Sequence, residues 1–134
     1  MNTTDEIFCD SYERCIRKAD FFDRFYDRYV SSNDIVAQKF ANADMEAQKR
    51  MLNASLHMLM SLSTNDSEEA VAYFERIGTA HGRSALNIGP ELYDLWMTCL
   101  LQTVEECDSR YDPSVENAWR EALSGGIKIM QSMY

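Results

Sequence analysis

The chain has 134 residues, of which 46% are hydrophobic and 26% are charged, proportions typical of one globular domain over residues 1–134. Its 13 Lys and Arg residues stand against 22 Asp and Glu residues, for a formal net charge of -9. Such an acidic surface repels the phosphates of nucleic acids and anionic lipids, so we expect neither as a partner. With only 5 Gly and 2 Pro, the composition favours an all-α fold over one rich in tight turns.

Export and membrane insertion are not expected. The first residues, MNTTDE, lack the basic and apolar stretches of a signal peptide. No apolar run approaches the roughly 20 residues that span a bilayer. Four scattered cysteines form no CxxC pair. We therefore expect a cytoplasmic protein with reduced cysteines.

Polar and turn-forming residues divide the chain into about seven expected helices. These cover residues 5–18, 20–30, 34–40, 44–62, 67–82, 90–107 and 113–133. The residues Ser-Ser-Asn-Asp at 31–34 predict a break that caps the short third helix, and Asn42 or Asp44 is expected to cap the fourth. The polar run STNDS at 63–67 predicts a loop. Gly125 and Gly126 inside the last helix predict a kink or a close helix contact.

Apolar residues recur at helical spacing in these segments, which predicts one buried face for each helix. The stripes are Phe22, Phe25, Tyr26 and Tyr29; Met45, Gln48, Leu52, Leu56 and Leu59; Val71, Phe74, Ile77 and His81; Leu92, Leu95, Trp96, Cys99 and Thr103; and Val115, Trp119, Leu123, Ile127 and Met130. Gln48 and His81 are the members that do not fit an apolar face.

His81 has two interpretations. A histidine at the end of an apolar stripe is most often a core residue with one hydrogen bond, but a neutral imidazole on an inward face also suits an axial metal ligand. The other histidine, His57, lies nine residues after Gln48 and so about 180° away on the helix, where we expect it to face outward. The residue spacing gives no support to a zinc site made of protein side chains alone. Taken singly, Gln48, Tyr26 and Phe40 are also ordinary core or edge residues.

Taken together, Tyr26, Phe40, Gln48, Leu52 and His81 occur in an order and spacing that resembles a bacterial globin. The segments that carry this resemblance are FYDRY at 25–29, QKRML at 48–52, IGTAH at 77–81, IGPELYDLW at 88–96 and NAWR at 117–120. The resemblance covers about residues 20–130. It is to single-domain globins and the globin domains of flavohaemoglobins, and the late motifs also resemble the globin domains of bacterial globin-coupled sensors.

The resemblance implies a globin fold that binds haem b, with His81 as the proximal ligand of the iron and the sixth position open to O2, CO or NO. It implies that Tyr26 and Gln48 donate hydrogen bonds to the bound gas, which gains partial negative charge when it is O2. The other residues implied to contact haem are Leu52, Phe40, Ile77 and Tyr93. Eight steps separate Phe40 from Gln48, two fewer than in flavohaemoglobins, so Met45 and Lys49 are alternatives at the distal position.

The leading functional hypothesis is reversible O2 binding, for transport or storage. The alternatives are detoxification of NO or peroxide with electrons from a separate reductase, a haem-based gas-sensing module, and a helical interaction module without haem. Self-sufficient NO dioxygenase activity is not expected, because the chain carries no flavin or nicotinamide segment. We expect a monomer or a homodimer.

Overall fold

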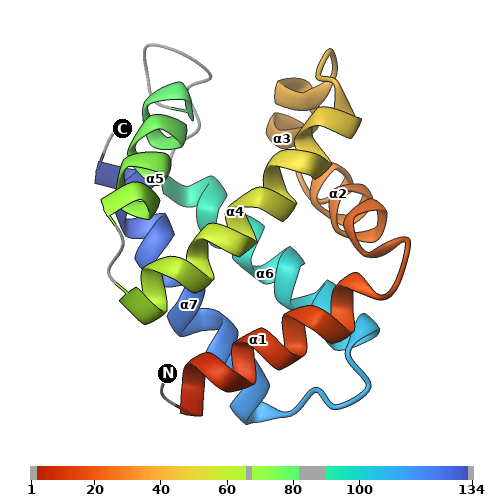
Figure 1. Cartoon of the computed structure of the whole chain (residues 1–134). Helices are drawn as coiled ribbons and strands as arrows, with labels where there is room; N and C mark the ends of the chain where they lie inside the picture. Colours follow the sequence, from red (N-terminus) through yellow and green to blue (C-terminus); the bar gives the residue numbers. More distant parts are fainter. Residues whose placement is uncertain (1–2, 66–67, 82–89, 133–134) are drawn as a thin grey trace.

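The computed structural model describes residues 3–65, 68–81 and 90–132, and within these ranges the chain forms seven helices and no strand. The helices are α1 (Thr3–Ile16), α2 (Phe21–Ser32), α3 (Asp34–Phe40), α4 (Met45–Asn65), α5 (Glu68–His81), α6 (Pro90–Cys107) and α7 (Pro113–Ser132), shown in Figure 1. The all-α prediction is therefore confirmed for the described part of the chain.

Helix α4 runs diagonally through the molecule, with α2 and α3 on one side and α5 on the other (Figure 1). Helix α5 packs on α7, α2 packs on α6, and α1 packs against both α7 and α4. This arrangement brings helices that are distant in the sequence around a common interior. The candidate site lies in that interior.

The caps of α3 and α4 follow from the polar residues between the helices. Asn33 accepts a hydrogen bond from the backbone N–H of Ile35 at 2.7 Å, and Asp44 accepts one from Ala47 at 3.2 Å. Each cap satisfies an amide that would have no partner at the start of its helix. Of the two candidates for the cap of α4, Asp44 is therefore the one used.

The prediction of a loop at residues 63–67 is wrong at its start. Helix α4 continues through Asn65, and the rest of the predicted loop lies outside the described residues. Serine and threonine disfavour a helix only mildly, so they do not end one that is already long. Helix α1 instead ends at Ile16, two residues early, where Lys18 N donates to the carbonyl of Cys15 at 3.0 Å in a turn. The predicted helix end at Gly82 lies outside the described residues.

Most residues of the predicted stripes are buried or half-buried, with departures in α2, α5 and α6. In α2 the first fully buried aromatic residue is Phe21, while Phe22 is half-buried. In α5 Ala70 is buried while Val71 is half-buried, and in α6 Leu100 and Val104 are fully buried although no stripe included them.

At the centre of the core lies Trp119, which is fully buried and packs edge-to-face on Phe8 of α1 with ring centroids 4.9 Å apart. Helix α1, for which no stripe was predicted, therefore contributes to the same core as α7.

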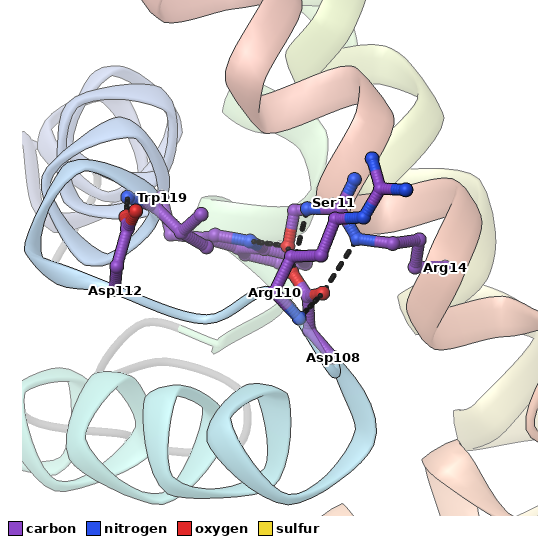
Figure 2. Close-up of polar contacts among 7 residues, drawn as sticks. Ser11, Arg14, Asp108, Arg110, Asp112 and Trp119 are labelled. Atoms are coloured by element: carbon purple, nitrogen blue, oxygen red, sulfur yellow. Dashed lines mark hydrogen bonds and ion pairs between the residues drawn. The ribbon is translucent and has the colours of Figure 1, made fainter.

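A buried polar network joins α1 to the turn between α6 and α7 (Figure 2). The carboxylate of Asp108 accepts hydrogen bonds from Arg14 Nε at 2.5 Å, Ser11 Oγ at 2.6 Å and the backbone N–H of Arg110 at 2.9 Å. Ser11 Oγ in turn accepts a hydrogen bond from Trp119 Nε1 at 2.8 Å. The Asp108 side chain is fully buried, so these donors replace the water that it loses.

The network depends on the ionised form of Asp108. Burial by itself would raise the pKa of this carboxyl, but the hydrogen bonds from Arg14 and Ser11 outweigh burial and hold the pKa below its ordinary value of 3.8. Since the folded pKa is lower than the unfolded one, the contribution to stability is complete above about pH 4 to 5. It is lost as the pH falls through the folded pKa.

We expect Asp108→Ala to lower the free energy of unfolding at pH 7 by about 3 kcal/mol, because Arg14 and Ser11 lose their buried acceptor. The matched control is Asp20→Ala, which removes an exposed carboxylate 2.7 Å from Arg24 and should change stability little. Urea denaturation at pH 7 and pH 3 measures both effects, and the deficit of the Asp108 variant should shrink at the lower pH. Equal losses in the two variants at pH 7 would contradict this role.

Candidate functional site

An apolar cavity lies among α2, α3, α4, α5, α6 and α7. The space between its walls, counted together with the open solvent at its mouth, is about 730 Å³. The lining residues are Tyr26, Tyr29, Phe40, Gln48, Met51, Leu52, Ser55, Leu56, Leu59, Phe74, Ile77, Tyr93, Trp96, Leu123, Gly126, Ile127 and Met130. Aromatic and aliphatic side chains dominate this wall, and Gln48 and Ser55 are its strongly polar members.

Six of the seven residues that the sequence pattern singled out lie on this wall. They are Tyr26, Phe40, Gln48, Leu52, Ile77 and Tyr93, and they come from five different helices. The seventh, His81, is the last residue of α5, four positions after Ile77, and its side chain lies outside the described residues. The fold therefore brings together residues that are spread from position 26 to position 93 of the sequence.

Tyr26 is fixed on the cavity wall by two ring contacts and one hydrogen bond. Its side chain is 7% exposed, and its ring packs edge-to-face on Phe25 and Phe40, with centroids 4.9 Å and 6.1 Å away. Its hydroxyl donates a hydrogen bond to the main-chain carbonyl oxygen of Gln48 at 3.1 Å. Burial raises the pKa of Tyr26 far above its ordinary value, so the phenol stays neutral and keeps its proton at physiological pH.

Gln48 is the one of three distal candidates that reaches the cavity. Its half-buried side chain forms no hydrogen bond with the described residues, which leaves the amide free to meet a ligand. Lys49 Nζ instead lies 2.5 Å from Asp23 Oδ1 and 3.2 Å from Glu46 Oε1, at the surface. Met45 is half-buried and does not line the cavity. The helix register thus favours Gln48.

The remaining predicted residues form part of the apolar wall of the cavity. Leu52 is buried, while Phe40 and Ile77 are half-buried at the edge of the cavity. Tyr93 is 7% exposed, and burial raises its pKa to about 12. Together these side chains give the cavity a surface that favours an apolar ligand over water.

Part of the cavity was not assigned to a site by the sequence. Its inner wall consists of residues that were expected only to pack in the core: Leu56, Leu59, Phe74, Leu123, Ile127 and Met130. Their helical spacing correctly indicates an inward face. The same spacing does not say whether that face meets protein or an open volume, because both are apolar surroundings. Tyr29 and Trp96 were missed as lining residues for the same reason.

Gly126 allows α7 to approach α4 and α5 closely at this wall. A Cβ atom at position 126 would lie 2.8 Å from Leu59 Cδ2 and 3.2 Å from Phe74 Cε1, nearer than side chains normally pack. Helix α7 continues through this position to Ser132. Of the two roles predicted for the glycine pair, the close helix contact is therefore the one confirmed.

These residues fit a haem group. A flat macrocycle requires apolar contacts on its two faces and an axial nitrogen ligand for its metal ion. The aromatic and aliphatic wall provides the contacts, and α5 ends on a histidine next to that wall. In the part of the chain that the structure describes, no three His, Cys, Asp or Glu side chains gather as a metal site, and no helix is both long and apolar enough to cross a membrane.

Comparison with known proteins agrees with this geometry. Residues 20–130 match the globin family. The chain belongs to that family. It is also similar to a crystal structure of a protein from Pseudomonas aeruginosa PAO1, described as structurally highly homologous to a human hemoglobin, with a TM-score of 0.91 and 36% sequence identity over 98% of each chain. No curated protein sequence matches the chain.

Membership of the family confirms the predicted globin fold. It also supports haem binding, since globins carry haem and bind diatomic gases. The more specific likeness to flavohaemoglobins and to sensor domains remains a prediction.

We expect Gly126→Val to lower the free energy of unfolding by about 2 kcal/mol, because the added side chain must displace Leu59 and the ring of Phe74. In a Leu59→Ala background the same substitution should cost less, because the truncated side chain leaves room for the valine. Urea denaturation of the four proteins measures this coupling. The close contact would be refuted by equal costs in the two backgrounds.

Proposed function

We propose that this globin binds haem b in the cavity and reversibly binds O2 there, with CO and NO as alternative ligands, for oxygen transport or storage. One observation carries the proposal: six residues of the globin pattern, dispersed in the sequence, line one apolar cavity. Bound haem supplies an iron ion that takes one protein nitrogen and leaves a position for a diatomic gas. The side chains determine how the group is held and which gas is favoured.

His81 is the proposed axial ligand. It lies at the end of α5, one turn after the cavity residue Ile77, and a neutral imidazole is a good donor to iron. The other histidine is a poor candidate for this position. His57 is exposed on α4 and packs edge-to-face on Tyr12, with ring centroids 5.2 Å apart.

The apolar wall has two proposed roles. Phe40, Leu52 and Ile77 offer flat or branched apolar surface against the faces of the macrocycle. The same side chains exclude water, and hydrogen bonds in a dry cavity are stronger than those made in water.

Tyr26 and Gln48 are the proposed hydrogen-bond donors to the gas. The phenol of Tyr26 keeps its proton, and the amide of Gln48 is not engaged with another described residue. A ligand with partial negative charge gains from such donors, whereas the less polar CO gains little. The pair should therefore favour O2 relative to CO.

We expect the protein reconstituted with haemin to show a Soret band, and His81→Ala to weaken haem binding at least tenfold, because the axial nitrogen is lost. His57→Ala is the matched control, since it removes the exposed histidine and should leave haem affinity unchanged. Absorption titration with haemin measures all three proteins. A missing Soret band in the unmodified protein, or unchanged binding by His81→Ala, would refute the proposal.

We expect Tyr26→Phe to increase the rate of O2 dissociation about tenfold, the equivalent of ~1.4 kcal/mol for a lost hydrogen bond. The CO dissociation rate should change less than about twofold, since CO accepts hydrogen bonds weakly. Stopped-flow ligand replacement gives both rates. The control is Tyr111→Phe, whose hydroxyl bonds Glu116 outside the cavity. Unchanged O2 dissociation in Tyr26→Phe would remove Tyr26 as a donor to the gas.

A further inference from the structure

The hydroxyl of Tyr26 has a single hydrogen atom, so it can donate one hydrogen bond, and in the structure it donates this bond to one acceptor. The carbonyl oxygen of Gln48, 3.1 Å away, can only accept, so the hydroxyl is the donor in this bond. The proposed function requires the same proton for a gas in the cavity. The main chain of α4 and the ligand are therefore competitors for it.

The partly buried Tyr26–Gln48 bond is one of two polar contacts between α2 and α4 in the described chain. The other is the ion pair of Lys49 with Asp23, whose side chain is 55% exposed. An ion pair so exposed to water contributes little to stability. The attachment of the start of α4 to α2 consequently depends on the Tyr26 hydroxyl more than on the surface pair.

We propose that Tyr26 is a ligand-sensitive clamp between α2 and α4. Without a polar ligand, the Tyr26 hydroxyl donates its hydrogen bond to the Gln48 carbonyl. When a ligand accepts this hydrogen bond instead, the carbonyl is released and the start of α4 is held less firmly. This inference rests on the proposed function, because it makes O2, but not CO, the releasing ligand. Gln48 lies inside α4, so its carbonyl keeps its intrahelical partner on release, and the exchange leaves no buried group unsatisfied.

The size of the effect follows from the strength of one neutral hydrogen bond. Such a bond shifts an equilibrium by about fivefold. The start of α4 should therefore open about five times more often when the clamp is released. Because O2 must displace the Gln48 carbonyl from Tyr26, the hydrogen bond from Tyr26 stabilises bound O2 by less than it would without this competitor.

The clamp itself can be tested on the full chain as purified, by amide hydrogen exchange. In Tyr26→Phe we expect the amides of residues 45–52 to exchange about fivefold faster. The matched control is Tyr29→Phe: this α2 hydroxyl also donates to a main-chain carbonyl at 3.1 Å and lines the same cavity, but its acceptor is Leu92 of α6. That variant should leave residues 45–52 unchanged. Equal exchange of this segment in Tyr26→Phe and the unmodified protein would overturn the clamp.

Ligand sensitivity is tested on haem-loaded ferrous protein equilibrated with O2 or with CO. We expect residues 45–52 to exchange about fivefold faster under O2 than under CO, and the difference to vanish in Tyr26→Phe. The same exchange under both gases, or a difference that persists in the variant, would overturn the proposal. Failure to take up haem would refute the proposed function and the ligand dependence, while the comparison of Tyr26→Phe with Tyr29→Phe would still decide whether the clamp exists.

Discussion

The rest of the structure depends on keeping an apolar cavity open among six helices of a chain of 134 residues. Protein interiors are close-packed, and apolar volume left unfilled lowers stability. A group that binds in the cavity of the folded protein, and does not bind the unfolded chain, stabilises the folded state by mass action. The same volume that makes the globin suited to a prosthetic group therefore ties its stability to that group.

Two contacts between helices lie at opposite kinds of place, one in a polar network and one on the cavity wall. At one end of the molecule, the buried side chain of Asp108 fixes α1 to the turn before α7 by accepting hydrogen bonds from Ser11, Arg14 and the backbone of Arg110. At the inner wall, Gly126 lets α7 come close to α4 and α5 without a side chain entering the space. The first contact joins α1 to the turn before α7, and the second sets how closely α7 approaches the cavity wall formed by α4 and α5.

The distal side is built differently, with a single, partly buried hydrogen bond between α2 and α4 among the described residues. A weak attachment is easily exchanged for a bond to a ligand, since one neutral hydrogen bond contributes only about 1 kcal/mol. Tyr26 is for this reason both a wall residue and a helix contact. This side of the cavity should respond to what occupies it more readily than the side near Gly126.

Much of the fold was predictable, because local chemistry decides it. The Asn33 cap and the starts of α6 and α7 at Pro90 and Pro113 are set by residues within a few positions of the helix ends. The extension of α4 to Asn65 was missed, because Ser and Thr are compatible with both helix and loop. The distal register was open among Met45, Gln48 and Lys49, which lie within four positions of one another along one helix.

The sequence by itself determined the helices, their inward faces and the order of residues typical of a globin, because these depend on spacing along the chain. The tertiary structure decided which inward faces surround an open volume and which of them pack on protein. It also decided that Lys49 pairs with Asp23 at the surface while Gln48 meets the cavity, and that the proton of Tyr26 is directed to a main-chain carbonyl. These are choices between partners distant in the sequence, and periodicity specifies a face but not what that face contacts.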